Sequence, residues 1–195
     1  ILPHPLTRRY DMIFLGGGPA GITTALELSK DTSLKTAVIE SGLLEPHPTI
    51  QTLGNVQIHG DLSEKYFPMH TQRCFGGSST IWGGFCAVLE KRAFTAQAWP
   101  IPYQEISRWY PAAARIIELP DDAYRKPTVA IEGTSELIYK PFYVSPPVRF
   151  NKKYHSFFQH HPRVDLILGS PGFRLMTQGR TVPPHDVADA KAPRA

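Results

Sequence analysis

Apolar residues near the start of the chain follow two different periodicities in succession. Residues 12–15 form a continuous apolar run of strand length. From residue 20 to residue 28 the apolar side chains recur at helical spacing, and residues 36–39 are again an apolar run of strand length. This order predicts a strand, a helix and a second strand, which is the βαβ unit of an α/β fold with a parallel sheet.

Three glycines occupy the predicted turn between the first strand and the helix. Gly16, Gly18 and Gly21 have the spacing G-x-G-x-x-G. In such a turn the first glycine permits the tight bend, the second lets backbone approach a pyrophosphate, and the third lets helix pack on strand. The free N–H groups of the helix start would face the phosphates, and Pro19 suits that start because no N–H is needed from it.

A carboxylate follows the second predicted strand. Glu40 lies nineteen positions after Gly21, close to the separation of roughly 20 residues at which an acid meets a ribose hydroxyl in dinucleotide-binding folds. A negative charge at this position argues against a ligand with a 2′-phosphate. We therefore predict a dinucleotide site, and the alternative is a structural βαβ turn that binds nothing.

The composition is that of a globular protein with many irregular connections. The 195 residues are 42% hydrophobic and 19% charged, which suits one domain with a sizeable core, and the 19 prolines predict a loop-rich fold. The net charge of +4 comes from scattered basic residues, so no nucleic-acid partner is expected. No apolar run approaches the roughly 18 residues that span a bilayer.

The two cysteines, Cys74 and Cys86, lack C-x-x-C spacing and cannot form a metal site by themselves. We expect them to be unpaired and partly buried, with a disulfide as the alternative. Unpaired thiols slightly favour the cytoplasm, although the compartment is otherwise undetermined.

A second glycine-rich segment, RCFGGSSTIWGGF, runs from residue 73 to residue 85. Its two Gly-Gly pairs would let backbone come close to a flat ligand, while Ser78, Ser79 and Thr80 offer short hydrogen-bonding groups. The alternative is a tight glycine turn beneath a buried Trp82. The position of the segment after a dinucleotide unit favours a role in cofactor binding.

Three segments together resemble the glucose-methanol-choline (GMC) oxidoreductases, a family of FAD-dependent enzymes that oxidise alcohols and sugars by hydride transfer to flavin N5. They are YDMIFLGGGPAGITTALELSK with VIESG, RCFGGSSTIWGGF, and WPIPYQEISRWYPAAARIIEL. The resemblance covers roughly residues 10–119 well and the remainder loosely. It implies a Rossmann-like FAD-binding α/β fold with a parallel sheet, incomplete in this chain, and the start of a substrate or cap region.

The resemblance also implies roles for the residues that match the family's motifs. Gly16, Gly18 and Gly21 would hold the FAD pyrophosphate, and Glu40 would hold the adenosine ribose. The residues expected along the flavin side are Arg73, Gly76, Gly77, Ser78 and Ser79. Those expected near the isoalloxazine ring are Trp82 and Gly83. Some sugar-oxidising relatives attach FAD covalently through a histidine where this chain has Ile81, so we predict non-covalent FAD.

The same resemblance predicts four parts of the chain. They are an FAD-binding βαβ unit with the flavin loop (1–95), the start of a substrate or cap region (96–148), a return to the FAD-binding domain (149–182) and a disordered tail (183–195). Within them we expect helix over much of 99–119 with Pro111 at a helix start or break, a strand within 136–143, and a strand over 164–168. Relatives use the last strand beside the adenine, and Pro171 departs from their pattern there.

Alcohol oxidation needs a base that accepts the hydroxyl proton. In the family the base is a histidine far toward the C-terminus of a much longer chain, and no position here matches it. Of the candidates His155, His160 and His161, we expect the adjacent pair on a surface loop. We therefore assign no catalytic residue and interpret the chain as the N-terminal part of a larger flavoenzyme, ending after about Val182 and inactive alone.

Three functions stay open at this point. The first is an FAD-dependent oxidoreductase acting on an alcohol or sugar, and the second is a non-catalytic FAD-binding module. The third is another flavin or nicotinamide enzyme that shares only the first glycine motif. The electron acceptor is undetermined, with oxygen, a quinone and a cytochrome as candidates.

Overall fold

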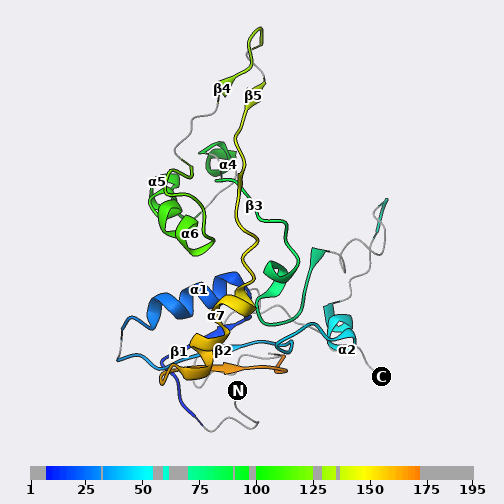
Figure 1. Cartoon of the computed structure of the whole chain (residues 1–195), viewed down its shortest axis with the longest axis vertical. Coiled ribbons are helices and arrows are strands. Elements are labelled where there is room, and N and C mark those ends of the chain that lie inside the picture. Colours follow the sequence, from blue (N-terminus) through cyan, green and yellow to red (C-terminus); the bar gives the residue numbers. More distant parts are fainter. Residues whose placement is uncertain are drawn as a thin grey trace.

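A three-stranded parallel sheet and two helices form the base of the computed structural model, and a narrow arm rises from this base (Figure 1). The structure describes residues 8–31, 33–54, 59–61, 70–89, 91–96, 100–124, 129–134 and 137–171. The strands are β1 (Met12–Leu15), β2 (Thr36–Ile39), β3 (Phe85–Cys86), β4 (Val129–Ala130), β5 (Ile138–Tyr139), β6 (Tyr143–Val144) and β7 (Val164–Ile167). The α-helices are α1 (Pro19–Leu28), α2 (Pro48–Gln51), α4 (Lys91–Ala96), α5 (Tyr103–Ser107), α6 (Tyr110–Ile116) and α7 (Phe150–His160). The 3₁₀ helices are η1 (Thr52–Gly54) and η2 (Gly77–Thr80).

The sheet has the order β1-β2-β7, and both pairings are parallel. The predicted parallel α/β fold is therefore confirmed. The strands predicted over 12–15 and 36–39 have those bounds, and the strand predicted over 164–168 ends one residue earlier, at Ile167. The central strand β2 is covered, with Ala37 and Val38 fully buried, whereas Leu15 on the edge strand is 71% exposed.

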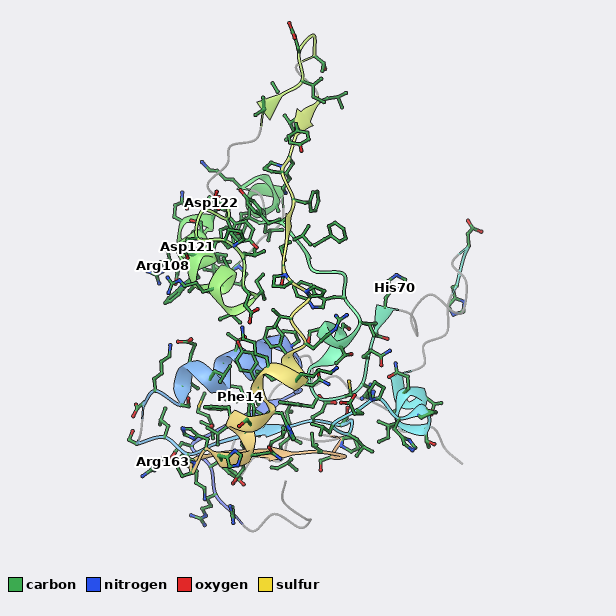
Figure 2. All side chains as sticks on the ribbon, in the orientation of Figure 1. Phe14, His70, Arg108, Asp121, Asp122 and Arg163 are labelled. Atoms are coloured by element: carbon green, nitrogen blue, oxygen red, sulfur yellow. The ribbon has the colours of Figure 1, made fainter. Side chains whose placement is uncertain are left out.

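Helix α1 forms as its sequence pattern predicts. Pro19 lies in its first turn, Gly18 is the N-cap, and Ile22 and Ala25 are buried against the sheet. Helix α1 contacts β2, α7 contacts β7, and the two helices contact each other. Phe14 packs against the same core from β1 (Figure 2). The main core therefore lies between the sheet and these two helices.

Helix α7 was not predicted, and the expectation of a surface loop at His160 and His161 is wrong. His160 is the last residue of α7, and His161 is its C-cap. The helix forms because aromatic residues recur at helical spacing and bury one face, with Phe150 and Phe158 both under 5% exposed. Pro162 then prevents continuation of the helix. His160 is exposed, so only the loop is wrong in that expectation and the surface position is correct.

The arm comprises the short elements β3, α4, α5, α6, β4, β5 and β6 (Figure 1). Strands β3 and β6 pair antiparallel, as do β4 and β5. Residues 136–143 were expected to contain one strand. They contain β5 and the first residue of β6, which belong to different sheets. Pro111 lies in the first turn of α6, as expected for a helix start. Arg108, Asp121 and Asp122 belong to the surface of this arm (Figure 2).

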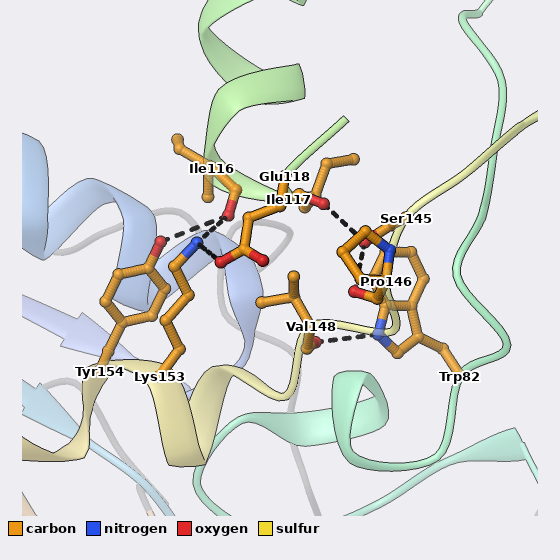
Figure 3. Close-up of polar contacts among 9 residues, drawn as sticks. All are labelled: Trp82, Ile116, Ile117, Glu118, Ser145, Pro146, Val148, Lys153 and Tyr154. Carbon is orange, nitrogen blue, oxygen red and sulfur yellow. Dashed lines mark hydrogen bonds and ion pairs between the residues drawn. The ribbon is translucent and has the colours of Figure 1, made fainter. Parts of the chain in front are cut away.

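Polar contacts join the arm to the base beside α7 (Figure 3). The Lys153 ammonium lies 2.7 Å from the Glu118 carboxylate and donates to the Ile116 carbonyl oxygen at 2.8 Å. The Ser145 hydroxyl donates to the carbonyl oxygen of Ile117. Since α6 ends at Ile116, these contacts fix the end of α6 against the first turns of α7.

Cys74 and Cys86 are free and buried, so the disulfide alternative is wrong, and their burial is more complete than expected.

The predicted tail over 183–195 and the chain end near Val182 lie outside the described residues. The four-part division of the chain stays a prediction. None of the helices in the described ranges is long and apolar enough to cross a bilayer.

Candidate cofactor site

The first glycine motif and the predicted ribose acid meet at one edge of the sheet. Gly16 follows β1 and Glu40 follows β2, and because the two strands are parallel neighbours their carboxyl ends lie together. The Gly16 N–H donates to the Ile39 carbonyl oxygen at 2.8 Å, which closes this edge. Ligands of open parallel sheets bind outside the carboxyl ends of the strands.

The three glycines of the first motif meet different local constraints. Gly16 has a φ of +109°, which other residues rarely adopt. A Cβ at Gly21 would lie 2.1 Å from the Gly16 carbonyl oxygen, so only glycine permits the close approach of α1 to the turn. At Gly18 nothing lies within 4 Å of a Cβ position. The open space at Gly18 is where a ligand could approach the backbone.

The N-terminus of α1 suits an anion. Its N-cap makes no side-chain hydrogen bond, and its first turn holds no acidic residue. Ile22 is the first residue of the helix whose N–H reaches a helical carbonyl, that of Gly18, at 3.0 Å. The preceding N–H groups and the helix dipole therefore favour a negatively charged ligand, such as a pyrophosphate, at this end.

Glu40 is 6% exposed and its carboxylate is held by three donors. One carboxylate oxygen accepts from the Gly17 N–H at 2.7 Å. The other accepts from the Gly42 N–H at 2.7 Å and from the Ser41 hydroxyl at 3.1 Å. A carboxylate has about four acceptor positions, so one position on the first oxygen stays available to a ribose hydroxyl. Glu40 therefore also fixes the glycine turn.

Arg73 shares a cavity of about 350 Å³ with Glu40. Its guanidinium donates to the Ser41 hydroxyl at 2.9 Å, and its backbone N–H donates to the side-chain oxygen of Gln51 at 2.9 Å. Neither Gln51, which ends α2, nor Ser41 was predicted as a site residue. The structure thus places the Arg73 side chain beside the predicted ribose acid.

The second glycine segment lies directly on the first. The Gly76 N–H donates to the Gly17 carbonyl oxygen at 2.7 Å, and a Cβ at Gly77 would lie 3.2 Å from the Gly18 Cα. Gly76 and Gly77 have φ values of +92° and +52°. Two motifs that are distant in the sequence therefore form one backbone surface at the carboxyl edge of the sheet.

The two serines of this segment have different surroundings. Ser79 is buried, and its hydroxyl donates to the Gly76 carbonyl oxygen at 2.6 Å and accepts from the Phe150 N–H at 3.2 Å. Its side chain therefore holds the loop against α7. Ser78 is exposed, and its hydroxyl donates to the carbonyl oxygen of His70 at 3.2 Å.

Trp82 is held by the segment that leads into α7. Its indole N–H donates to the Val148 carbonyl oxygen at 3.0 Å (Figure 3). The Arg149 guanidinium donates to the carbonyl oxygens of Trp82 and Ser79 at 2.8 Å and 3.0 Å. Gly83, the next residue, is exposed. Arg149 was not predicted as a site residue, because its only local feature in the sequence is a basic residue at the start of the aromatic helical pattern.

The candidate histidines are not part of this arrangement. The His160 ring nitrogen lies 2.8 Å from the Ser156 carbonyl oxygen, and His161 accepts from the Arg163 N–H. His155 belongs to the middle of α7, and its ring Nε2 is buried without a hydrogen-bond partner. In the described part of the chain, no group of three His, Cys, Asp or Glu residues could hold a metal ion.

Cys74 lies between the predicted site residues Arg73 and Gly76. Its thiol is fully buried, and this burial raises its pKa. The thiol is therefore protonated near neutral pH and unsuited to act as a nucleophile.

No protein-family model matches the sequence, and no curated protein matches it. Among solved structures the chain is similar to pyridoxine 4-oxidase from Mesorbium loti, with 17% sequence identity and a TM-score of 0.49. The match covers 89% of this chain and 45% of the oxidase chain, so this chain spans less than half of the oxidase's length. A similarity this distant carries no conclusion about function, and membership of the GMC family stays a prediction.

Proposed function

We propose that this chain binds FAD without a covalent bond, as part of an oxidoreductase that acts on the CH–OH group of an alcohol or sugar. One observation carries the proposal. The two glycine segments, each predicted independently to approach a cofactor, touch through Gly17 and Gly76 at the carboxyl edge of a parallel sheet. The buried carboxylate of Glu40 adjoins the same turn. Two of the three segments of the GMC resemblance thus meet at one place.

The residues present fit FAD in three respects. The uncapped N-terminus of α1 and the open space at Gly18 suit the pyrophosphate. The remaining acceptor position of Glu40, within the cavity shared with Arg73, suits the adenosine ribose. Gly16 and Gly21 support the turn that would hold the pyrophosphate. We assign the flavin side to the loop residues Gly76, Gly77, Ser78, Ser79, Trp82 and Gly83, and we move Arg73, expected on the flavin side, to the ribose because its side chain lies beside Glu40. Ile81 offers no side chain for covalent attachment.

FAD, when bound, supplies the redox chemistry as a hydride acceptor. The residues of this chain bind and orient it. Arg149 and Val148 hold Trp82 in place, and Ser79 holds the loop to α7. We propose no catalytic residue, because no position matches the family's C-terminal histidine, and the rings of His160 and His161 contact Ser156 and Arg163. The 195-residue chain alone is expected to bind FAD and not to turn over an alcohol.

The second candidate is a non-catalytic FAD-binding module. The contacts of the His160 and His161 rings with Ser156 and Arg163 favour it, because such a module needs the same cofactor residues and no base. In either case we propose that residues 1–95 and 149–182 form the FAD-binding part and that 96–148 begin a substrate or cap region. The pairing of β7 with β2 and the projection of the arm support this division (Figure 1).

Flavin retention tests both candidates, and dye reduction by a longer version of the protein separates them. The purified chain is loaded with FAD, freed of excess cofactor, and mixed with a panel of alcohols and sugars and an electron-accepting dye. Retained flavin without reduction is expected of both candidates for this chain alone. Substrate-dependent dye reduction by a longer chain that carries the expected C-terminal histidine would support the oxidoreductase, and its absence there would support the module. Absence of flavin from folded protein would contradict both. Acid precipitation should release the flavin into the supernatant, and flavin left in the pellet would contradict non-covalent binding.

A further inference from the structure

The arm contains a cavity of about 490 Å³ that is lined by none of the residues assigned to FAD. Its walls come from α5, α6 and the segment after α6, so a single stretch of the chain, residues 103–124, supplies the lining. The volume lies within the roughly 300–1,000 Å³ of pockets that bind small molecules. The lining residues that bear on the choice of ligand are Tyr103, Tyr110, Tyr124, Arg115 and Asp121.

Three tyrosines give the cavity aromatic walls. The ring centroids of Tyr110 and Tyr124 lie 6.0 Å apart. The Tyr110 hydroxyl donates to the Leu89 carbonyl oxygen at 3.1 Å, and the Tyr124 hydroxyl interacts with the Cys86 thiol. Because these two hydroxyls have partners in the protein, ring surface is what both residues chiefly offer a ligand. Aromatic rings pair favourably with other aromatic rings, so the cavity favours a ligand that carries one.

The backbone of Tyr124 has an unusual conformation beside this cavity. Its φ is +68°, which a bulky residue rarely adopts. Glu118 has a similar φ of +59°, but it directly follows the C-cap of α6, where left-handed backbone is common. Tyr124 is at no helix end of this kind. Strained residues of this type are concentrated at ligand-binding sites, so the position of the Tyr124 ring is a second feature that points to a ligand.

One cation and one anion line the same cavity. Arg115 and Asp121 are both exposed, and in the described part of the chain neither side chain has a hydrogen-bond or ion-pair partner. The cation disfavours a metal ion, and the anion disfavours a phosphate. A ligand with a carboxylate and an ammonium group complements both side chains, since a guanidinium donates to a carboxylate and an ammonium donates to a carboxylate.

We propose that this cavity binds a free aromatic amino acid as its zwitterion. The ring of the ligand packs against the tyrosine rings, Arg115 donates to the ligand's carboxylate, and the ligand's ammonium group donates to Asp121. The site is a binding site and not a site of oxidation. It goes beyond the function proposed above and is independent of FAD, since it uses none of the residues assigned to the cofactor.

Saturation-transfer NMR on the full 195-residue chain, without FAD, tests the proposal with free phenylalanine, tyrosine and tryptophan as probes. At least one of them should bind saturably, with the strongest saturation on its ring protons. Three analogues each lack one feature: phenylacetate lacks the ammonium, phenethylamine lacks the carboxylate, and free alanine lacks the ring. The first two should bind about threefold more weakly than phenylalanine, the effect of one exposed ion pair, and alanine should show no saturable binding.

Variants locate the binding. Tyr103→Ala should weaken it about tenfold through loss of an aromatic wall, whereas Tyr103→Phe, which keeps the ring, should retain the affinity. Arg115→Gln and Asp121→Asn, at exposed positions, should each weaken it about threefold. Arg108→Gln is the control, because Arg108 is an exposed arginine of the arm that does not line the cavity (Figure 2).

If Tyr103→Ala fails to fold, the two charge variants decide. Absence of saturable binding by all three aromatic amino acids would overturn the proposal, as would binding of alanine, phenylacetate or phenethylamine as tight as that of phenylalanine. Unchanged affinity in both Arg115→Gln and Asp121→Asn would also overturn it. Retention of FAD is measured separately on the same protein, so loss of one binding activity is distinguishable from loss of the other.

Discussion

The backbone N–H of Gly76 donates a hydrogen bond to the carbonyl oxygen of Gly17 at 2.7 Å. Gly17 in turn donates its own N–H to the Glu40 carboxylate at 2.7 Å. These two bonds connect the turn after β1, the end of β2 and the second glycine segment. The predicted cofactor residues are therefore mechanically coupled, and a change at one of them is expected to affect the position of the others.

Two alanine substitutions in the first glycine motif should have different effects on stability. Gly18 has φ −81°, which alanine adopts, and its Cβ would meet open space, so Gly18→Ala should fold with nearly unchanged stability. It should still weaken FAD binding by at least about tenfold, because the added methyl occupies the space of the approaching pyrophosphate. Isothermal titration with FAD and denaturant unfolding measure the two quantities.

Gly21→Ala is the matched contrast. Its Cβ would lie 2.1 Å from the Gly16 carbonyl oxygen, so α1 must move away from the turn. The free energy of unfolding should fall by about 1–3 kcal/mol, as for other overpacked sites. Equal stability of the two variants, or undiminished FAD affinity of folded Gly18→Ala, would contradict the assigned roles of these glycines.

Glu40→Gln keeps the shape of the side chain and removes one acceptor oxygen. Three donors now converge on the carboxylate, and an amide would leave at least one of the N–H groups of Gly17 and Gly42 without a good acceptor. We expect a loss of about 1–3 kcal/mol in the free energy of unfolding, the cost of an unsatisfied buried group. FAD affinity should fall as well. Glu132→Gln, on the arm, serves as the control in denaturant unfolding, and an equal effect in both variants would refute the role of Glu40 in fixing the turn.

Arg149→Met should loosen the flavin loop. The substitution keeps much of the apolar stem and removes the donors to the carbonyl oxygens of Ser79 and Trp82. FAD affinity should fall about tenfold, and stability by about 1–2 kcal/mol. Arg163→Met is the control, because Arg163 also donates to a backbone carbonyl oxygen, that of Ser33, away from the site. A similar loss of FAD affinity in both variants would show that the loop contacts are not responsible.

Stability should decrease in alkaline solution through Tyr10. Burial, together with a hydrogen bond from its hydroxyl to Asp165 at 2.7 Å and the Asp165 charge, raises the pKa of Tyr10 from 10.0 to about 12. The folded state thus favours the protonated phenol. The stabilisation that the folded state gains from the protonated Tyr10 is complete below pH 10 and is lost as the pH rises through about 12.

Tyr10→Phe should therefore be less stable below pH 10 and lose less stability between pH 10 and pH 12 than the wild type. Some pH dependence should persist, because burial also raises the pKa of Tyr124 to about 12. Denaturant unfolding across this range measures the effect, with Tyr139→Phe, at an exposed position, as the control. If the free energy of unfolding fell equally with pH in the wild type and in Tyr10→Phe, the raised pKa of Tyr10 would not be the cause of the alkaline loss of stability.

The strands and helix of the first motif could be predicted because their information is local. A run of apolar residues and the glycine spacing suffice for β1, α1 and β2. Helix α7 was missed because lysines and a histidine separate its aromatic residues, although Phe150, Tyr154, Phe157 and Phe158 have helical spacing. The two-residue strands β3 to β6 are too short to have a period.

The site could be predicted as a set of residues and not as a set of contacts. Nothing local indicates that Gly17 binds Glu40, that Gln51 supports Arg73, or that Arg149 holds the loop of Trp82. The contact of Gly17 with Glu40 follows from the parallel pairing of β1 with β2. Arg149 reaches the loop because the pairing of β7 with β2 brings α7 back to the sheet after a long intervening segment. Burial of Ser79 likewise follows from α7, and its hydroxyl supports the loop that is assigned to the flavin.

The central claim is that this chain holds FAD at the carboxyl edge of its sheet. The most direct test is the absorbance spectrum of the 195-residue chain after incubation with FAD and desalting, with Gly18→Ala treated identically. We predict flavin bands that correspond to close to one FAD per folded wild-type chain and that acid releases, and clearly weaker bands for Gly18→Ala. Folded wild-type protein that emerges without flavin, or a variant that retains as much flavin as the wild type, would contradict it.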